Sequence, residues 1–283
     1  MLPSDLSLQV AAALREDLGG GDLTAALVPA AQLAAATVIT REQAVLCGSA
    51  WFDETFRQLD PAITVSWQMQ DGATVGPGMT LCTVRGPARP ILSGERTALN
   101  FLQLLSGTAT AASRFVAAVA GSGCRILDTR KTLPGLRSAQ KYATRCGGVQ
   151  NHRMGLYDQV LIKENHITAA GSILAAVQAA RRSAPGVVVE VEVENLVELE
   201  QALAARPEIV MLDEFSLADL RAAAVRNRAL GSPVRLEASG SVSLDGVREI
   251  AGTGVDFISV GSITKHVRAT DLSMRLQLSS AGS

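Results

Sequence analysis

The spacing of apolar residues changes partway along the chain. The predicted elements of the first part are a helix at Leu6–Leu18 and short strands at Ala36–Thr40 and Ile63–Gln68. This mixture predicts an α+β domain. The segment from Ile91 to Ala120 is rich in alanine and leucine and contains no proline. It therefore predicts one long helix, either continuous or broken near Gly107.

After Gly121, short β-branched runs alternate with helical segments. The predicted strands are Arg125–Leu127, Gln159–Ile162, Val187–Val193, Ile209–Leu212, Val234–Leu236 and Phe257–Val260. Strands that alternate with helices predict a parallel sheet, and a series of such units favours a barrel or a partial barrel. A doubly wound open sheet is the alternative.

Almost every one of these strands ends in a polar cluster. The clusters are Asp128–Lys131, Lys163–His166, Glu192–Asn195, Asp213–Glu214, Glu237–Gly240 and Gly261–Ser262. In barrels, catalytic residues gather at the rim formed by the carboxyl ends of the strands. The repeated pattern therefore predicts one common site.

The clusters also separate by charge. Between Asp128 and His166 seven cationic residues stand against three anionic ones. The cations are Arg130, Lys131, Arg137, Lys141, Arg145, Arg153 and Lys163. Guanidinium groups bind carboxylates through paired hydrogen bonds, so this half of the rim suits a small, multiply charged carboxylate. Surface salt bridges are the alternative role, favoured for Lys141 and open for Arg137 and Arg145.

The later strand ends are acidic. The run VVVEVEVE has a period of two, which puts Glu190, Glu192 and Glu194 on one face and valines on the other. Because the valines should face the helices, the carboxylates point inward, where each needs a cation, a metal or hydroxyl donors. Glu190 is expected to be a structural ion-pair partner. Glu192 and Asp213 are the candidates for a substrate hydroxyl or a magnesium-bound ligand.

Small residues follow the last two strands. Ser239, Gly240 and Ser241 come after one strand, and Gly261 and Ser262 after the next. Small residues let backbone N–H groups approach an anion, and late barrel loops often bind phosphate. His152, between Asn151 and Arg153, is a candidate substrate contact, and the chain has no HEXXH or CxxC pattern for zinc.

Composition limits the function classes. The chain has 283 residues, 47% hydrophobic and 19% charged, and a formal net charge of -1, so no global basic field favours nucleic acid. No apolar run approaches the roughly 20 residues that span a bilayer, and the first 20 residues lack a signal-peptide pattern. We expect a cytoplasmic protein without membrane or nucleic-acid partners.

Four scattered cysteines are read as reduced core residues, namely Cys47, Cys82, Cys124 and Cys146.

Several motifs in order resemble one known family. They are Glu16-Asp-Leu-Gly-Gly-Gly-Asp-Leu-Thr24, Gly94-Glu-Arg-Thr-Ala-Leu-Asn100, Leu105-Ser-Gly-Thr-Ala-Thr110, Asp128-Thr-Arg-Lys-Thr-Leu-Pro-Gly-Leu-Arg137, Asn151-His-Arg153, Leu161-Ile-Lys-Glu-Asn-His166, Glu190 to Glu194, Met211-Leu-Asp213 and Ser239-Gly240. Together they cover essentially the whole chain and look like the signature of the quinolinate phosphoribosyltransferases.

The resemblance implies a reaction and a fold. Members of this family convert quinolinate and phosphoribosyl pyrophosphate, with Mg²⁺, to nicotinate mononucleotide, carbon dioxide and pyrophosphate in de novo NAD biosynthesis. The implied fold class is α/β, with an N-terminal α/β sandwich domain packed on an incomplete α/β barrel. The sandwich would comprise residues 1–110 together with 268–283, and the barrel residues 111–267.

The resemblance also implies residue roles. Quinolinate would contact Arg130, His152, Arg153 and Lys163, while Arg96 would reach the site of a partner subunit in a homodimer with shared active sites. The candidate catalytic residues are Lys131, Lys163, Glu192 and Asp213, of which Glu192 and Asp213 would hold Mg²⁺ directly or indirectly. The 5′-phosphate of phosphoribosyl pyrophosphate would contact Ser239, Gly240, Gly261 and Ser262.

Two positions depart from the family pattern. Ser241 stands where a glycine is more common, so it must avoid a positive φ or adopt one at some cost. Gln150 also replaces a frequent glycine, which could alter how His152 and Arg153 approach the substrate. Neither change removes a charged group.

Two other functions are consistent with parts of the pattern. Lys131 or Lys163 could form a Schiff base, as in barrel lyases, although both have charged neighbours rather than an apolar pocket. A homologue associated with molybdenum uptake, acting as an accessory or binding protein, would share many motifs. The adjacent His152 and Arg153, with Glu192 and Asp213 intact, favour the enzyme.

Overall fold

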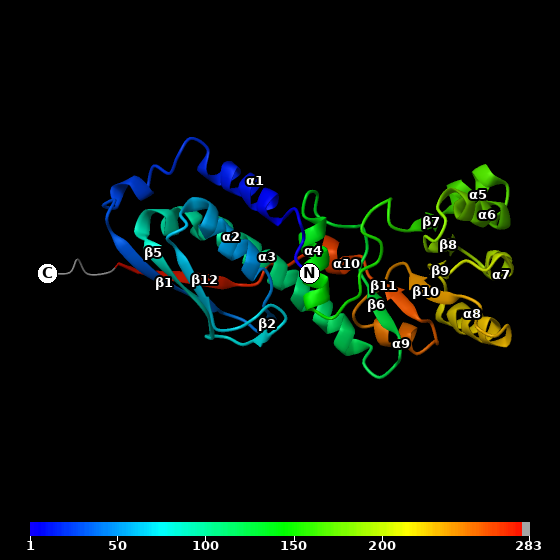
Figure 1. Ribbon diagram of the computed structural model, residues 1–283. Coiled ribbons are helices and arrows are strands. Elements are labelled where there is room, and N and C mark those ends of the chain that lie inside the picture. Colours follow the sequence, from blue (N-terminus) through cyan, green and yellow to red (C-terminus); the bar gives the residue numbers. More distant parts are fainter. Residues whose placement is uncertain (279–283) are drawn as a thin grey trace. The chain divides into compact units, whose positions relative to one another are not determined.

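The computed structural model describes residues 1–278, which form two compact units (Figure 1). Among the described residues, the first unit contains Met1–Ser113, Leu133–Gly148 and His266–Leu278. The second contains Arg114–Thr132 and Val149–Lys265. The expected division at 110/111 therefore lies close to the first boundary. The segment Leu133–Gly148, expected in the barrel, belongs instead to the first unit.

The first unit is built on a four-stranded antiparallel sheet in the order β12-β1-β5-β3. Its strands are β1 (Leu33–Thr40), β2 (Ala44–Val45), β3 (Thr64–Trp67), β4 (Thr74–Val75), β5 (Thr80–Pro87) and β12 (Leu272–Leu278), of which β2 and β4 form a separate pair. Its helices are α1 (Leu6–Leu18), the 3-10 turn η1 (Ala25–Leu27), α2 (Ser49–Leu59), α4 (Arg137–Cys146) and most of α3 (Ala88–Ala118). The C-terminal part of the chain thus supplies an edge strand to the N-terminal sheet.

Two apolar clusters hold the first unit together. Alternate residues of β1 are buried and pack with Phe52 and Phe56 of α2, as the period of two requires for a strand with one covered face. The second cluster joins α1 and α4 to Trp51 of α2. It buries Ala139 and Ala143, which is the physical reason that α4 belongs to this unit and not to the barrel.

The long helix α3 is continuous through Gly107. A β-carbon at Gly107 would lie only 2.1 Å from the carbonyl oxygen of Arg268, so this glycine lets the returning chain cross the helix closely. The predicted long helix is confirmed, and the optional break is wrong because the glycine serves packing rather than a kink.

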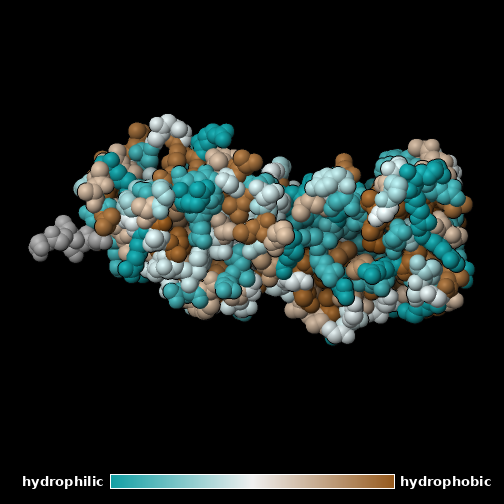
Figure 2. Space-filling view, in the orientation of Figure 1, coloured by the Kyte–Doolittle hydropathy of each residue, from teal (hydrophilic) through white to brown (hydrophobic). Residues whose placement is uncertain are grey.

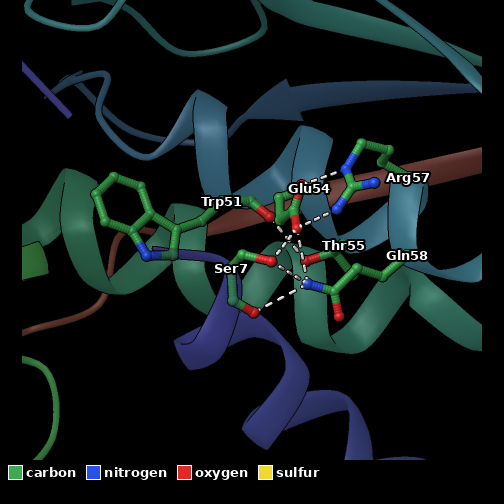
Figure 3. Close-up of polar contacts among 6 residues, drawn as sticks. All are labelled: Ser7, Trp51, Glu54, Thr55, Arg57 and Gln58. Carbon is green, nitrogen blue, oxygen red and sulfur yellow. Dashed lines mark hydrogen bonds and ion pairs between the residues drawn. The ribbon is translucent and has the colours of Figure 1, made fainter. Parts of the chain in front are cut away.

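A polar network joins α1 to α2 (Figure 3). The hydroxyl of Ser7 donates to Glu54 over 2.6 Å, and Gln58 donates to both Glu54 and Ser7. Arg57 also donates to Glu54, and this hydrogen bond is the largest cause that lowers the pKa of Glu54 to about 2. Glu54 therefore stays ionised and fastens the first helix at neutral pH.

The second unit is a six-stranded parallel sheet in the order β6-β11-β10-β9-β8-β7. The strands are β6 (Arg125–Leu127), β7 (Val160–Ile162), β8 (Val189–Val193), β9 (Ile209–Asp213), β10 (Arg235–Ser239) and β11 (Phe257–Ser259). The first strand pairs with the last, as in a barrel, while β6 and β7 are not paired within the described residues. The incomplete barrel is confirmed, and the doubly wound sheet is wrong because the strand order never reverses.

Helices alternate with these strands. They are α5 (Glu164–Ala170), α6 (Ile173–Ser183), α7 (Leu196–Ala205), α8 (Leu217–Ala229), α9 (Val247–Ala251) and α10 (Ser262–Lys265). Ser172, Asn195 and Ser216 cap three of them by accepting backbone N–H groups of the first turn. The face of the molecule seen in Figure 2 carries both hydrophilic and hydrophobic side chains. None of the helices within residues 1–278 is long and apolar enough to span a bilayer.

Candidate active site

One cavity of about 250 Å³ lies at the carboxyl ends of the barrel strands in the second unit. It is lined by Thr129, Arg130, Lys131, His152, Arg153, Leu161, Lys163, Glu192, Met211, Asp213, Glu237, Ser239 and Ser259. The lining includes most of the residues singled out from the sequence. They come from strand ends that are distant in the chain, as expected for a barrel rim.

The loop after β6 presents Arg130 and Lys131. The hydroxyl of Thr264 donates to the carbonyl of Lys131 over 2.8 Å, and the N–H of Lys131 donates to the hydroxyl of Thr129 over 3.1 Å. A β-carbon on Gly261 would lie 3.0 Å from Cδ of Lys131, so glycine leaves the lysine side chain its path. These contacts fix the backbone from which the lysine extends.

A buried carboxylate anchors the next loop. Asp128 accepts hydrogen bonds from the side-chain amide of Asn151 at 2.5 Å and from the N–H of His152 at 3.0 Å. The chain around Gln150 lies beside β6, since Gln150 exchanges backbone hydrogen bonds with Ile126 and Asp128. The segment with His152 and Arg153 is therefore held to the open edge of the barrel.

His152 is oriented at both ring nitrogens. Its Nδ1 accepts the N–H of Arg153 over 2.7 Å, so the ring proton is on Nε2, which lies 2.8 Å from Oε2 of Glu190. The same oxygen of Glu190 accepts a hydrogen bond from the side-chain amide of Gln159 at 2.8 Å. His152 thus connects the Arg153 backbone to the interior of the barrel.

Arg153 and Arg130 crowd positive charge into the cavity wall. The pKa of Arg153 is lowered, first by burial and then by the charge of Arg130, while Glu190, Asp158 and Glu192 act in the opposite direction. Within residues 1–278, Nε of Arg130 is buried without a hydrogen-bond partner. A buried guanidinium donor without a partner is costly, so this wall is complementary to an anion with several oxygen atoms.

Another part of the lining, the acidic wall, carries carboxylates. Glu192, Met211 and Glu237 lie level with one another on β8, β9 and β10, because their registers pair directly. Lys163, which precedes α5, forms an ion pair with Glu192 and connects the two halves of the rim. Asp213 ends β9 beside them.

Glu190 of β8 and Glu237 of β10 are both fully buried. Burial is the largest cause that raises the pKa of Glu237 well above its usual value of 4.5, and the charge of Glu190 is the next. Glu237 therefore keeps its proton to a higher pH than a free carboxyl group does. The inward face predicted from VVVEVEVE is present for Glu190 and Glu192, whereas Glu194 lies beyond the strand and is exposed.

The loops of small residues that follow β10 and β11 contribute only in part to the cavity lining. Ser239 lines it, and Gly240 has a φ of 127° with the Glu214 carboxylate 2.7 Å from where a β-carbon would be. Ser241 avoids a positive φ, and its hydroxyl donates to Glu214 over 3.0 Å; Glu214 itself takes a φ of 52°. Of the two alternatives expected for Ser241, the structure therefore has the one without a positive φ, and the preceding residue with a positive φ is a glycine.

Some expected residues are elsewhere. Gly240, Gly261 and Ser262 do not line the cavity, and Arg96 is exposed on α3 in the first unit. Sequence reasoning missed the lining residues Thr129, Leu161, Met211 and Ser259, as well as the support from Gln159. Ser259 could have been predicted because it ends a strand. The hydrogen bond from Gln159 to Glu190 could not, because nothing in the sequence around Gln159 indicates it.

Two family models match consecutive parts of the chain. The model described as quinolinate phosphoribosyl transferase, C-terminal domain, matches residues 108–275, and the N-terminal domain model matches residues 22–106. The chain belongs to the quinolinate phosphoribosyltransferase family. The resemblance drawn from the motifs is confirmed.

Curated relatives in the quinolinate phosphoribosyltransferase family align over nearly their whole length. A protein of Mycobacterium leprae named carboxylating nicotinate-nucleotide pyrophosphorylase is 42% identical over 271 residues, covering 93% of this chain and 94% of the relative. A human protein of the same name is 39% identical over 277 residues, covering 97% and 92%.

Solved structures match this chain over nearly its whole length. The nicotinate-nucleotide pyrophosphorylase of Francisella tularensis matches with a TM-score of 0.94 at 47% identity, covering 98% of each chain. NadC of Streptococcus pyogenes matches with a TM-score of 0.93 at 36% identity and the same coverage.

The raised pKa of Glu237 predicts a pH-dependent stability. Above pH 4.5 the folded chain retains a proton that the unfolded chain releases, so the free energy of unfolding falls as pH rises toward the raised pKa. The limiting slope is about 1.4 kcal/mol per pH unit. Glu237→Gln is neutral at every pH, and urea titrations at pH 5 and pH 8 should show a smaller loss than in the wild type.

The exposed Glu249→Gln variant is the control and should keep the wild-type difference between the two pH values. An undiminished loss in Glu237→Gln would mean that Glu237 is ionised in the folded protein.

Proposed function

We propose that this chain transfers the phosphoribosyl group of phosphoribosyl pyrophosphate to quinolinate, with decarboxylation. The products are nicotinate mononucleotide, carbon dioxide and pyrophosphate, which makes the protein an enzyme of NAD biosynthesis. The observation that carries the proposal is a single cavity with crowded guanidinium groups on one wall and carboxylates on the other. The names of the family and of the relatives support the same reaction.

Quinolinate is a pyridine with two adjacent carboxylates, and it fits the cationic wall. Arg130 and Arg153 repel each other, and a dianion between them would remove that repulsion while supplying acceptors to the buried Nε of Arg130. Lys163 would add a third positive charge at the edge next to Glu192. His152 lines the cavity and keeps the Arg153 backbone in place.

Phosphoribosyl pyrophosphate would occupy the acidic wall and the small-residue loops. Glu192 and Asp213 would accept ribose hydroxyls, while Ser239, Gly240, Gly261 and Ser262 would hold the 5′-phosphate through backbone N–H groups. Lys131, whose backbone is fixed by Thr264 and Thr129, would reach the pyrophosphate. Together these groups would place the anomeric carbon next to the pyridine nitrogen.

Magnesium fits the acidic wall in an indirect way. Among the described residues, the close cluster of possible ligands in this unit is His152, Glu190 and Glu237, and neither Glu192 nor Asp213 belongs to it. Oxygen ligands from one or two carboxylates suit Mg²⁺ when substrate phosphates supply the others. We therefore propose that Glu192 and Asp213 would hold Mg²⁺ together with the substrate, where the ion would neutralise the departing pyrophosphate.

The chemistry follows from charge placement. As the bond from the anomeric carbon to pyrophosphate lengthens, positive charge grows on the ribose, beside Glu192 and Asp213, and negative charge grows near Lys131. The pyridine nitrogen forms the new bond. The ring then carries a positive charge, so the adjacent carboxylate can leave as carbon dioxide and its electron pair stays on the ring until a proton arrives. Arg130 and Arg153 position the ring throughout.

The proposal includes a homodimer with shared active sites, in which the exposed Arg96 of one subunit serves the site of the other. Arg96 and the cavity-lining residues belong to different compact units of the chain. A cytoplasmic location is also part of the proposal, and cell fractionation tests it.

Release of carbon dioxide tests the reaction directly. With quinolinate labelled at the carboxylate that is lost, labelled carbon dioxide should appear only when phosphoribosyl pyrophosphate and Mg²⁺ are both present. Nicotinate mononucleotide should form in equal amount. Release without phosphoribosyl pyrophosphate, or no release at all from folded protein, would refute the proposed reaction.

Arg153→Ala should act selectively on quinolinate. Loss of the bidentate, charge-assisted hydrogen bonds between the guanidinium and a quinolinate carboxylate should raise KM for quinolinate about 10- to 100-fold. KM for phosphoribosyl pyrophosphate should change about twofold or less. Arg153→Lys keeps the positive charge but cannot form the bidentate pair of hydrogen bonds, so its KM for quinolinate should lie between those of the wild type and Arg153→Ala. The exposed Arg182→Ala variant is the control, and equal losses for both substrates would contradict the assignment.

Mixed dimers test the shared site. Arg96→Ala and Lys163→Ala should each be nearly inactive, but a heterodimer would contain one site with both residues intact. Random mixing should then restore about a quarter of the wild-type activity if the subunits are related by twofold symmetry. Verified heterodimers without any recovered activity would place Arg96 outside the partner's site.

A further inference from the structure

Cys47 and Cys146 come together in the first unit, although 98 other residues separate them in the sequence. Their sulfur atoms and a carboxylate oxygen of Asp71 all lie within 4.8 Å of one another. None of these three residues lines the cavity of the second unit. Both cysteines are free thiols in the structure.

Both cysteines are held against α3. Cys47 exchanges two hydrogen bonds with Ser106, whose hydroxyl accepts the Cys47 N–H over 3.0 Å and donates to its carbonyl over 3.1 Å. Cys146 ends α4, and the next residue is Gly147, where a β-carbon would lie 2.3 Å from the carbonyl oxygen of Ala109. Two sites one turn apart on one helix therefore fix both cysteine backbones.

The two thiols have different environments. Cys47 is fully buried, and burial is the largest cause that raises its pKa. Cys146 is half-buried and its pKa is lowered, mainly because the Cys47 thiol donates a hydrogen bond to its sulfur, with support from Tyr142 and Arg145. Cys146 is therefore the thiol that ionises first and can meet a reagent from solvent.

The carboxylate between them already has partners. Asp71 accepts the N–H groups of Gly48 and Ser49 at the start of α2, at 3.0 and 3.2 Å, and the hydroxyl of Tyr142 at 2.8 Å. A metal ion would have to compete with these three donors for the carboxylate. The arrangement therefore favours chemistry between the two sulfurs over a cation site.

We propose that Cys47 and Cys146 form a reversible disulfide when the protein meets a small-molecule disulfide such as glutathione disulfide. The Cys146 thiolate attacks one sulfur of the reagent, forms a mixed disulfide and releases one glutathione thiolate, which takes up a proton. The Cys47 thiol then loses its proton and attacks the sulfur of Cys146, which releases the second glutathione. The protein loses two electrons and two protons, and the glutathione disulfide gains them.

The remaining cysteines serve as internal controls. Burial is the largest cause that raises the pKa of Cys82, and burial likewise raises the pKa of Cys124 to about 12. Neither belongs to the sulfur cluster found among the described residues. They should stay reduced under conditions that oxidise the proposed pair.

The experiment uses the full chain, reduced and then freed of reductant. After incubation with glutathione disulfide and alkylation of free thiols, intact mass should show two alkylated cysteines instead of four and the loss of two hydrogen atoms. Peptide mapping should show Cys47 joined to Cys146, and dithiothreitol should restore all four thiols. Four alkylated cysteines, or a crosslink through Cys82 or Cys124, would overturn the proposal.

Two variants test the order of the steps. Cys47→Ser should trap Cys146 as a stable mixed disulfide with glutathione, whereas Cys146→Ser should leave Cys47 unmodified. The reverse result would refute the assignment of Cys146 as the attacking thiol. Stoichiometric zinc in the purified wild type that is lost in Cys146→Ser would instead make the pair a metal site, against the proposal.

Discussion

Two carboxyl groups are fully buried inside the parallel barrel, and the site depends on how they are held there. Glu190 and Glu237 are fully buried. The pKa of Glu237 is raised by burial, while Glu190 lies against His152 and Gln159, which come from the segment beside the open edge of the barrel. Because an uncompensated buried charge is costly, the interior acts as an anchor for that segment.

The same anchor has an effect at the rim. His152 accepts the Arg153 N–H, and Asp128 accepts the N–H of His152, so the backbone that carries the Arg153 side chain is fixed at two successive residues. A cationic wall built on a loop would otherwise open under its own repulsion. The barrel thus holds like charges close together before any substrate arrives, which is what electrostatic preorganisation requires.

Much of this could be predicted from sequence because strands have a simple period. The alternation in VVVEVEVE placed Glu190 and Glu192 on the inner face, and polar residues at strand ends identified most of the cavity wall. The assignment of Leu133–Gly148 failed because the apolar face of α4 has no local signal for which core it joins. The support from Gln159 and the hydrogen bond from Ser241 to Glu214 were missed for a similar reason, since both depend on contacts across the fold.

The pairing of β12 with β1 has a consequence for synthesis on the ribosome. The N-terminal sheet is translated first, yet its last strand leaves the ribosome only after every residue of the second unit has been made. Until then, β1 has an unpaired edge that could join a neighbouring nascent chain. Translation order and folding order are therefore opposed here, and the barrel unit can be complete before the sheet that precedes it.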